Sequence, residues 1–139
     1  MATDMIRTAI DGGVNYIDTA YPYHNGESEL VVDRVFLATK REEMDRFLDE
    51  QLSRLATDHI DFYLLHGLSG ETWEKLSQLG VLELLDSVRA DGRIRYPAFS
   101  FHDLFPVYKE IVDAYEWTFA QIQYNYMDEE NQAGTQGLK

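Results

Sequence analysis

Chemically reactive side chains recur where apolar runs of this sequence end. Carboxylate, phenol, ammonium and imidazole groups exchange protons or stabilise charge, so this recurrence indicates acid–base chemistry at one edge of a sheet. The sequence has no cysteine, which excludes a thiolate nucleophile, a disulfide framework and a cysteine-ligated metal within it. The residues that end or follow these runs are Asp18, Tyr21, Tyr23, Lys40, His66, Ser100 and His102.

Composition predicts one acidic globular domain spanning residues 1–139. The chain is 45% hydrophobic and 13% aromatic, and its formal net charge is −13. Such a charge argues against nucleic acid or an anionic membrane as a partner, because both require clustered Lys and Arg. The N-terminal residues carry charge from Asp4 onward and resemble neither a signal peptide nor a membrane span. We therefore expect a cytoplasmic protein.

Helix and strand patterns alternate along the chain. The helix periodicity places apolar residues at spacings of three and four, whereas the strand patterns are short runs of β-branched and aromatic residues. The first helix is expected to begin at Thr3 or Asp4 and to end at Gly12 and Gly13. Further helices are expected over 27–34, 41–55, 72–92, 103–115 (interrupted early by Pro106) and near 131–139, and strands over 14–20, 35–40, 59–67, 93–101 and 119–127.

This alternation predicts an α/β fold with a parallel sheet covered by helices. The near-continuous apolar character of the strands fits a sheet that is buried on both faces. In (β/α)₈ barrels the reactive side chains lie at the carboxyl ends of the strands, so residues distant in sequence meet at one mouth. The strand-terminal residues therefore form the expected site.

Five ordered blocks cover most of the chain: GVNYIDTAYPYHNGESE, VFLATK, LSRLATDHIDFYLLHG, DGRIRYPAFSFHD and QIQYNY. They resemble signature segments of the aldo-keto reductase superfamily, closest to bacterial members. The resemblance implies a (β/α)₈ TIM barrel that binds NADPH, with NADH as the alternative, and reduces a small-molecule aldehyde or ketone. Some such members carry an iron–sulfur region further downstream.

The resemblance assigns the catalytic tetrad to Asp18, Tyr23, Lys40 and His66. Tyr23 is then the general acid that protonates the carbonyl oxygen. A phenol has an ordinary pKa near ~10, so it needs a neighbouring cation, which Lys40 supplies. Asp18 then keeps the lysine charged and is also expected to contact the cofactor. His66 positions the substrate carbonyl and stabilises negative charge on its oxygen.

The resemblance also implies residues that contact cofactor and substrate. Ser100 and Gln121 match positions that bind the nicotinamide carboxamide. Family members often have asparagine after that serine, where this chain has Phe101. Tyr21 and His102 are weaker candidates for substrate contact. No His, Asp and Glu set has metal-ligand spacing, so no metal site is expected.

Structural roles are the alternative for each of these residues. A strand-terminal aspartate such as Asp18 is often a turn acceptor or helix cap, and tyrosines are more often packing groups. Lys40 could be a solvated strand end, and a lone histidine such as His66 is more often a hydrogen-bonded core residue. Only their occurrence on successive strand ends, in the family's order, favours catalysis.

The sequence is shorter than a complete barrel, which typically needs about 250 residues. We expect segments to be missing near 30–34, near 40–41 and after 139, as in part of a longer enzyme. A truncated, non-catalytic binding or structural module is the alternative, with its open sheet edges covered by a partner or by self-association into a homo-oligomer. A barrel enzyme with other chemistry, such as hydrolysis, is less favoured because Lys40 beside Tyr23 suits proton donation.

Overall fold

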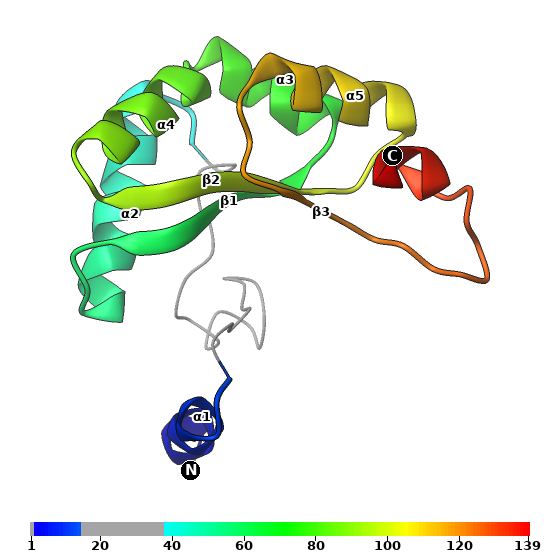
Figure 1. Ribbon diagram of the computed structural model, residues 1–139. Coiled ribbons are helices and arrows are strands. Elements are labelled where there is room, and N and C mark those ends of the chain that lie inside the picture. Colours follow the sequence, from blue (N-terminus) through cyan, green and yellow to red (C-terminus); the bar gives the residue numbers. More distant parts are fainter. Residues whose placement is uncertain (1, 15–37) are drawn as a thin grey trace.

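The computed structural model describes residues 2–14 and 38–139 (Figure 1). The helix expected over 27–34 and most of the strands expected over 14–20 and 35–40 lie outside the described residues. Asp18, Tyr21 and Tyr23 therefore lie outside them too. The described elements are α1 (Ala2–Asp11), α2 (Arg41–Leu55), β1 (Ile60–Leu68), α3 (Gly70–Gln78), α4 (Val81–Ala90), β2 (Ile94–Phe101), α5 (Phe105–Ala114), β3 (Ala120–Ile122) and the 3₁₀ helix η3 (Gly134–Leu138).

The described strands form one parallel sheet in the order β1-β2-β3. Sequential parallel strands joined by helices are the repeating unit of an α/β barrel. The structure is thus an α/β fold consistent with part of a (β/α)₈ barrel. Three strands are described, so closure of a barrel stays a prediction.

Helices cover one face of this sheet, where they bury its apolar side chains. Figure 1 shows α3, α4 and α5 along that face. The largest fully buried side chains come from the strands as well as the helices, and burying one Leu or Phe contributes about 1.5–3 kcal/mol to folding. These side chains are Met44, Leu48, Leu65, Leu68, Leu76, Leu84, Leu85, Ile94, Phe99, Phe101 and Ile111.

The amphipathic helix expected over 41–55 is confirmed as α2. Met44, Leu48 and Leu52 are buried at helical spacing, while acidic residues occupy the first turn, where they complement the helix dipole. The helix ends at Ala56, which has the left-handed φ of 53°. The sequence pattern therefore predicted both the bounds and the buried face of this helix.

The prediction of a single helix over 72–92 is wrong, because the chain forms α3 and α4 instead. Gly80 separates them with a φ of +74°, a conformation that glycine adopts without the steric cost of a Cβ. Ser69 caps α3 by accepting a hydrogen bond from the Thr72 amide. The break lets each short helix turn its own apolar stripe toward the sheet.

Three smaller expectations also need correction. Pro106 does not interrupt a helix but lies in the first turn of α5, where its missing N–H costs nothing. The strand expected over 119–127 pairs only over Ala120–Ile122. The helix expected near 131–139 is the short 3₁₀ helix η3.

The helix expected at the N-terminus is confirmed as α1, and Gly13 follows it with a φ of +97°. Its apolar residues Met5, Ile6 and Ile10 are 69%, 47% and 49% exposed. The amphipathic pattern thus predicted the helix without showing what its apolar face contacts. None of the helices in the described ranges is long and apolar enough to cross a lipid bilayer.

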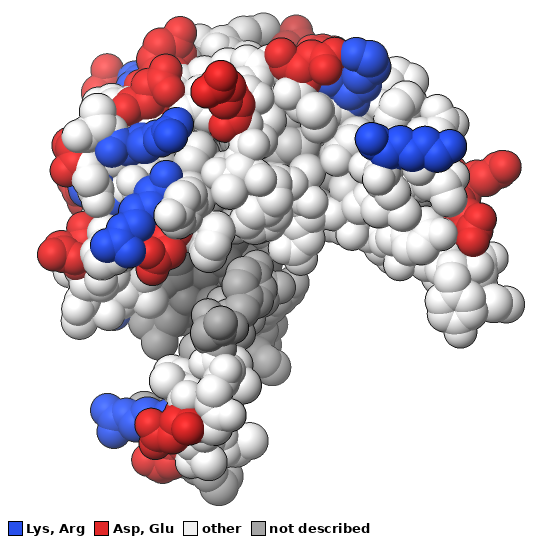
Figure 2. Space-filling view, viewed as in Figure 1, with Lys and Arg blue, Asp and Glu red and all other residues white. Residues whose placement is uncertain are grey.

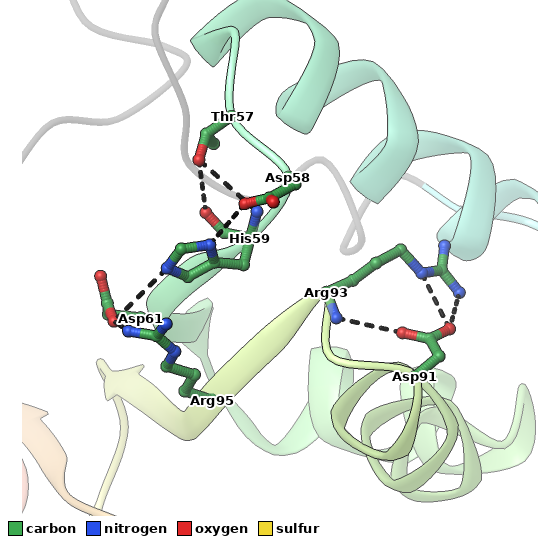
Figure 3. A network of polar contacts seen from close by, with 7 residues as sticks. All are labelled: Thr57, Asp58, His59, Asp61, Asp91, Arg93 and Arg95. Atoms are coloured by element: carbon green, nitrogen blue, oxygen red, sulfur yellow. Dashed lines mark hydrogen bonds and ion pairs between the residues drawn. The ribbon is translucent and has the colours of Figure 1, made fainter.

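Charged side chains hold the amino end of β2 to the helical layer, and Figure 3 shows the pairing of Arg93 with Asp91 there. The Arg93 guanidinium donates hydrogen bonds to Asp91 and to Asp49 of α2, each at 2.8 Å. It also forms an ion pair with Asp45 at 2.8 Å. These carboxylates raise the pKa of Arg93 above its ordinary value. This end of the sheet is therefore fixed by charge pairing, away from the expected site.

Candidate functional site

Three of the predicted site residues lie side by side at the carboxyl ends of adjacent strands. Ser100 of β2 is the register partner of Gln121 of β3, and His66 lies opposite Ser100 at the end of β1. Neighbouring strands are about 4.8 Å apart, so the three side chains occupy one level of the sheet. The structure thus brings together residues that are separated by up to 55 positions in sequence (121 − 66).

These residues lie on the face of the sheet that the helices do not cover. Side chains alternate along a strand, and Leu65 and Phe99 are fully buried on the helical side. His66, which follows Leu65, and Ser100, which follows Phe99, therefore point to the helix-free face. His66 is half-buried and Ser100 is 8% exposed there, whereas Gln121 is exposed.

A β-bulge marks the point where β1 reaches the candidate site. The pairing shifts between Leu65, which opposes Phe99, and Leu68, which opposes Phe101. The first strand therefore has two residues where the second has one. The residues concerned are His66 and Gly67 on β1 and Ser100 on β2.

Lys40, the predicted cation of the tetrad, lies at the N-cap position of α2 and is exposed. The turn before it is fixed by Glu43, which accepts hydrogen bonds from the Thr39 amide at 2.7 Å and the Thr39 hydroxyl at 3.0 Å. These bonds hold the pKa of Glu43 below its ordinary value. Because Asp18 and Tyr23 lie outside the described residues, convergence of the four tetrad residues stays a prediction.

His102 follows β2 and is exposed beside the same end of the sheet. Its backbone N–H donates to the Leu68 carbonyl at 2.9 Å, and its imidazole Cδ2 lies 4.0 Å from where a Cβ on Gly67 would stand. This position is compatible with the predicted substrate contact. His59, by contrast, lies at the opposite end of β1, where its Nδ1 is 2.6 Å from Asp58 Oδ1 (Figure 3).

Asp103 is a residue of this region that sequence reasoning missed. Its carboxylate accepts hydrogen bonds from the backbone amides of Gly70 and Leu104. The Gly70 bond and then the Leu104 bond lower the pKa of Asp103. An aspartate between a strand and a helix is a recognisable capping signal, but its partner across the loop could not be read from sequence.

Charged and aromatic side chains are distributed differently over the described surface. Figure 2 shows many acidic and basic side chains gathered over the helical layer in this view. Half-exposed aromatic side chains, Phe62 and Tyr96, stack at 5.2 Å on the helix-free face of the sheet.

The side chains of Ser100 and Gln121 offer both hydrogen-bond donors and acceptors at the strand ends. The Ser100 hydroxyl accepts one hydrogen bond from the protein, which leaves its proton to donate, and the Gln121 side chain offers both a carbonyl and an NH₂ group. Adjacent strands hold the two groups at one level. Within residues 2–14 and 38–139, no group of three or more His, Asp or Glu side chains is arranged to hold a metal ion.

Comparison with known proteins identifies relatives over most of the chain. A family model described as "Aldo/keto reductase family" matches residues 1–136. An uncharacterized oxidoreductase, YqkF of Bacillus subtilis, is 27% identical over 91% of this chain and 48% of its own length. Aldo-keto reductase YhdN of B. subtilis is 34% identical over 45% of the chain and 27% of its own length.

A third relative is morphine 6-dehydrogenase of Pseudomonas putida, 34% identical over 65% of this chain and 34% of its own length. The chain therefore spans about half the length, or less, of these curated relatives. The family match over residues 1–136 extends through the segments that carry the strand-end residues.

Proposed function

Because this chain belongs to the aldo/keto reductase family, we propose that it forms part of an enzyme that reduces an aldehyde or ketone to an alcohol. Family membership supports oxidoreductase activity in general. The finer assignment is supported by one observation above all: His66, Ser100 and Gln121 occupy the same level and face of adjacent strands. That arrangement can hold a carbonyl group and an amide-bearing cofactor side by side.

In this proposal Ser100 and Gln121 bind the carboxamide of NADPH, with NADH as the alternative. The Ser100 hydroxyl donates to the carboxamide oxygen, and the Gln121 carbonyl accepts from the carboxamide NH₂. NADPH, when bound, supplies the hydride. The two side chains fix the orientation of the ring that carries it, because contacts from two adjacent strands leave little rotational freedom.

His66 orients the substrate carbonyl and donates a hydrogen bond toward its oxygen, where negative charge develops. Tyr23 donates the proton to that oxygen as the alcohol forms. Lys40, kept charged by Asp18, favours the phenolate that remains. One charge contact at 4 Å contributes roughly 4 kcal/mol at an effective dielectric constant near 20, which corresponds to about three units of phenol pKa before desolvation.

This sequence has no cysteine, so it offers no thiolate ligand for an iron–sulfur cluster. Any such region would have to be supplied by other sequence. The proposed chemistry needs no cluster, since hydride transfer and protonation complete the reduction.

The decisive experiment is a Tyr23→Phe substitution in the purified protein. We expect kcat for reduction of a panel of aldehydes and ketones to fall by about 10²–10⁴-fold, the usual contribution of a general acid, while NADPH affinity stays the same. Tyr126→Phe is the matched control, because Tyr126 is 79% exposed and lies beyond β3. Full turnover in Tyr23→Phe would remove the phenol from the mechanism.

Cofactor binding is measured separately, by titrating the fluorescence of NADPH and of NADH with the same protein. Saturable binding that weakens in Gln121→Ala is the expected result. If neither dinucleotide binds, the reductase proposal is wrong for this chain and the alternative of a non-catalytic module takes its place.

A further inference from the structure

The β-bulge at the end of β1 changes which face of the sheet each following side chain occupies. With regular alternation after Leu65, position 68 would point away from the helices. Instead, Leu68 is fully buried and pairs with Phe101, whose ring packs against Tyr108 of α5 at 5.3 Å. The bulge therefore returns Leu68 to the core while leaving His66 on the helix-free face.

Gly67 is the residue that makes this bulge feasible. Its φ of +61° lies in the left-handed region, where a side chain would add strain. Bulges disrupt the regular ladder and leave backbone groups in need of another partner. For the Gly67 amide that partner is the Ser100 hydroxyl, whose Oγ accepts its hydrogen bond at 2.7 Å.

The Ser100 side chain is well placed to hold this geometry. It is 8% exposed, so the hydrogen bond is shielded from competing water. It lies on β2, whose pairing with β1 continues on both sides of the bulge. The backbone amide that it binds belongs to the residue directly after His66.

We propose that Ser100 is a positioning residue for His66, which acts by holding the His66–Gly67 bulge through the Gly67 amide. This inference rests on the proposed function for the role of His66, but the hydrogen bond itself can be tested without catalysis. One hydroxyl then serves two purposes: it accepts from the backbone beside the carbonyl-binding histidine, and it donates toward the cofactor amide.

The test compares three substitutions in the full protein. Ser100→Ala removes the acceptor, whereas Ser100→Thr keeps a hydroxyl at the same position. Ser69→Ala is the matched control, since it removes a serine that accepts a backbone amide hydrogen bond at the start of α3, one residue after β1. Ser69 thus tests whether any lost hydrogen bond near this strand end has the same effect.

The first readout is nuclear magnetic resonance, which does not depend on activity. In Ser100→Ala we expect amide exchange at Gly67 to accelerate at least tenfold and the pH titration of the His66 ring to shift, with both restored in Ser100→Thr. Ser69→Ala should leave both unchanged. An unchanged Gly67 exchange rate and His66 titration in Ser100→Ala would overturn the proposal.

The second readout is kinetic and uses Gly67→Ala, which disturbs the bulge without removing the hydroxyl. At saturating NADPH we expect kcat to fall by about 10-fold to 10²-fold, as for a misplaced reactive group, with little change in cofactor affinity. A fall in cofactor affinity alone would overturn positioning through the bulge. Absence of turnover in the unmodified protein would instead refute the proposed function and leave the magnetic resonance result standing.

Discussion

The carboxylate of Asp103 accepts a hydrogen bond from the Gly70 backbone amide at 2.8 Å, across 33 positions of sequence. The bond joins the first residue of α3 to the loop that follows β2. Gly70 is the first residue of α3, where backbone N–H groups have no partner within the helix. Asp103 therefore fixes the start of α3 to this loop beside the candidate site.

Replacing Asp103 with Ala should lower the free energy of unfolding by about 1–2 kcal/mol at pH 7, as expected for lost hydrogen bonds to a charged group near the surface. Because the pKa of Asp103 is lowered by folding, its stabilisation is present above the unfolded pKa and is lost as pH falls through the folded pKa. Urea unfolding from pH 7 to pH 2 measures both. A difference from the unmodified protein that persists at pH 2 would contradict this account.

Two arginines at the start of β2 should differ in their contribution to stability. Arg93 contacts three aspartates with a side chain that is 23% exposed, whereas Arg95 pairs with Asp61 with a side chain that is 55% exposed. We expect Arg93→Gln to cost about 1–3 kcal/mol and Arg95→Gln less than about 1 kcal/mol. Urea unfolding of both variants at low and high salt makes the comparison, and equal costs would contradict it.

Gly80 should resist substitution because of its backbone conformation. The backbone of Gly80 has a φ of +74°, which is strained for a residue with a side chain, and an added Cβ would lie 3.2 Å from a Glu83 oxygen. Gly80→Ala is therefore expected to destabilise the protein by about 1–2 kcal/mol. Gly70→Ala is the control, because its Cβ would make only ordinary contacts of 3.5 Å or more. Thermal unfolding measures the difference. Equal melting temperatures would mean that the turn between α3 and α4 relaxes without cost.

Tyr115 should make the free energy of unfolding fall at alkaline pH. Burial and its hydrogen bond to Asp86, at 2.7 Å, raise the pKa of Tyr115 to about 12. The folded state thus favours the protonated phenol, so the stabilisation is complete below the unfolded pKa near ~10 and is lost as pH rises through the folded value.

Urea unfolding of Tyr115→Phe against the unmodified protein, from pH 8 to pH 12, measures this effect. The difference in unfolding free energy between the two should be constant below pH ~10 and should decline above it. Tyr126→Phe, at an exposed position, should show no such decline. A difference that is flat across the whole range would show that Tyr115 titrates alike in both states.

Local sequence determined the elements whose patterns are self-contained. The apolar spacing and acidic first turn of 41–55 predicted α2, and the apolar run at 59–67 predicted β1 to within one residue at each end. The order of those elements also predicted that Ser100 and Gln121 would lie on neighbouring parallel strands, since short βα connections leave few alternatives. Neither prediction needed a contact between distant residues.

The tertiary structure alone decided the features that depend on a distant partner. The link from Asp103 to Gly70 and the bulge at His66 both depend on residues of another element, and sequence periodicity carries no such information. Strand residues alternate with a period of two, so a bulge of one residue reassigns every later side chain to the other face. The sequence determined that a histidine lies near the end of this strand, but only pairing with β2 decided that Leu68, after the bulge, returns to the core.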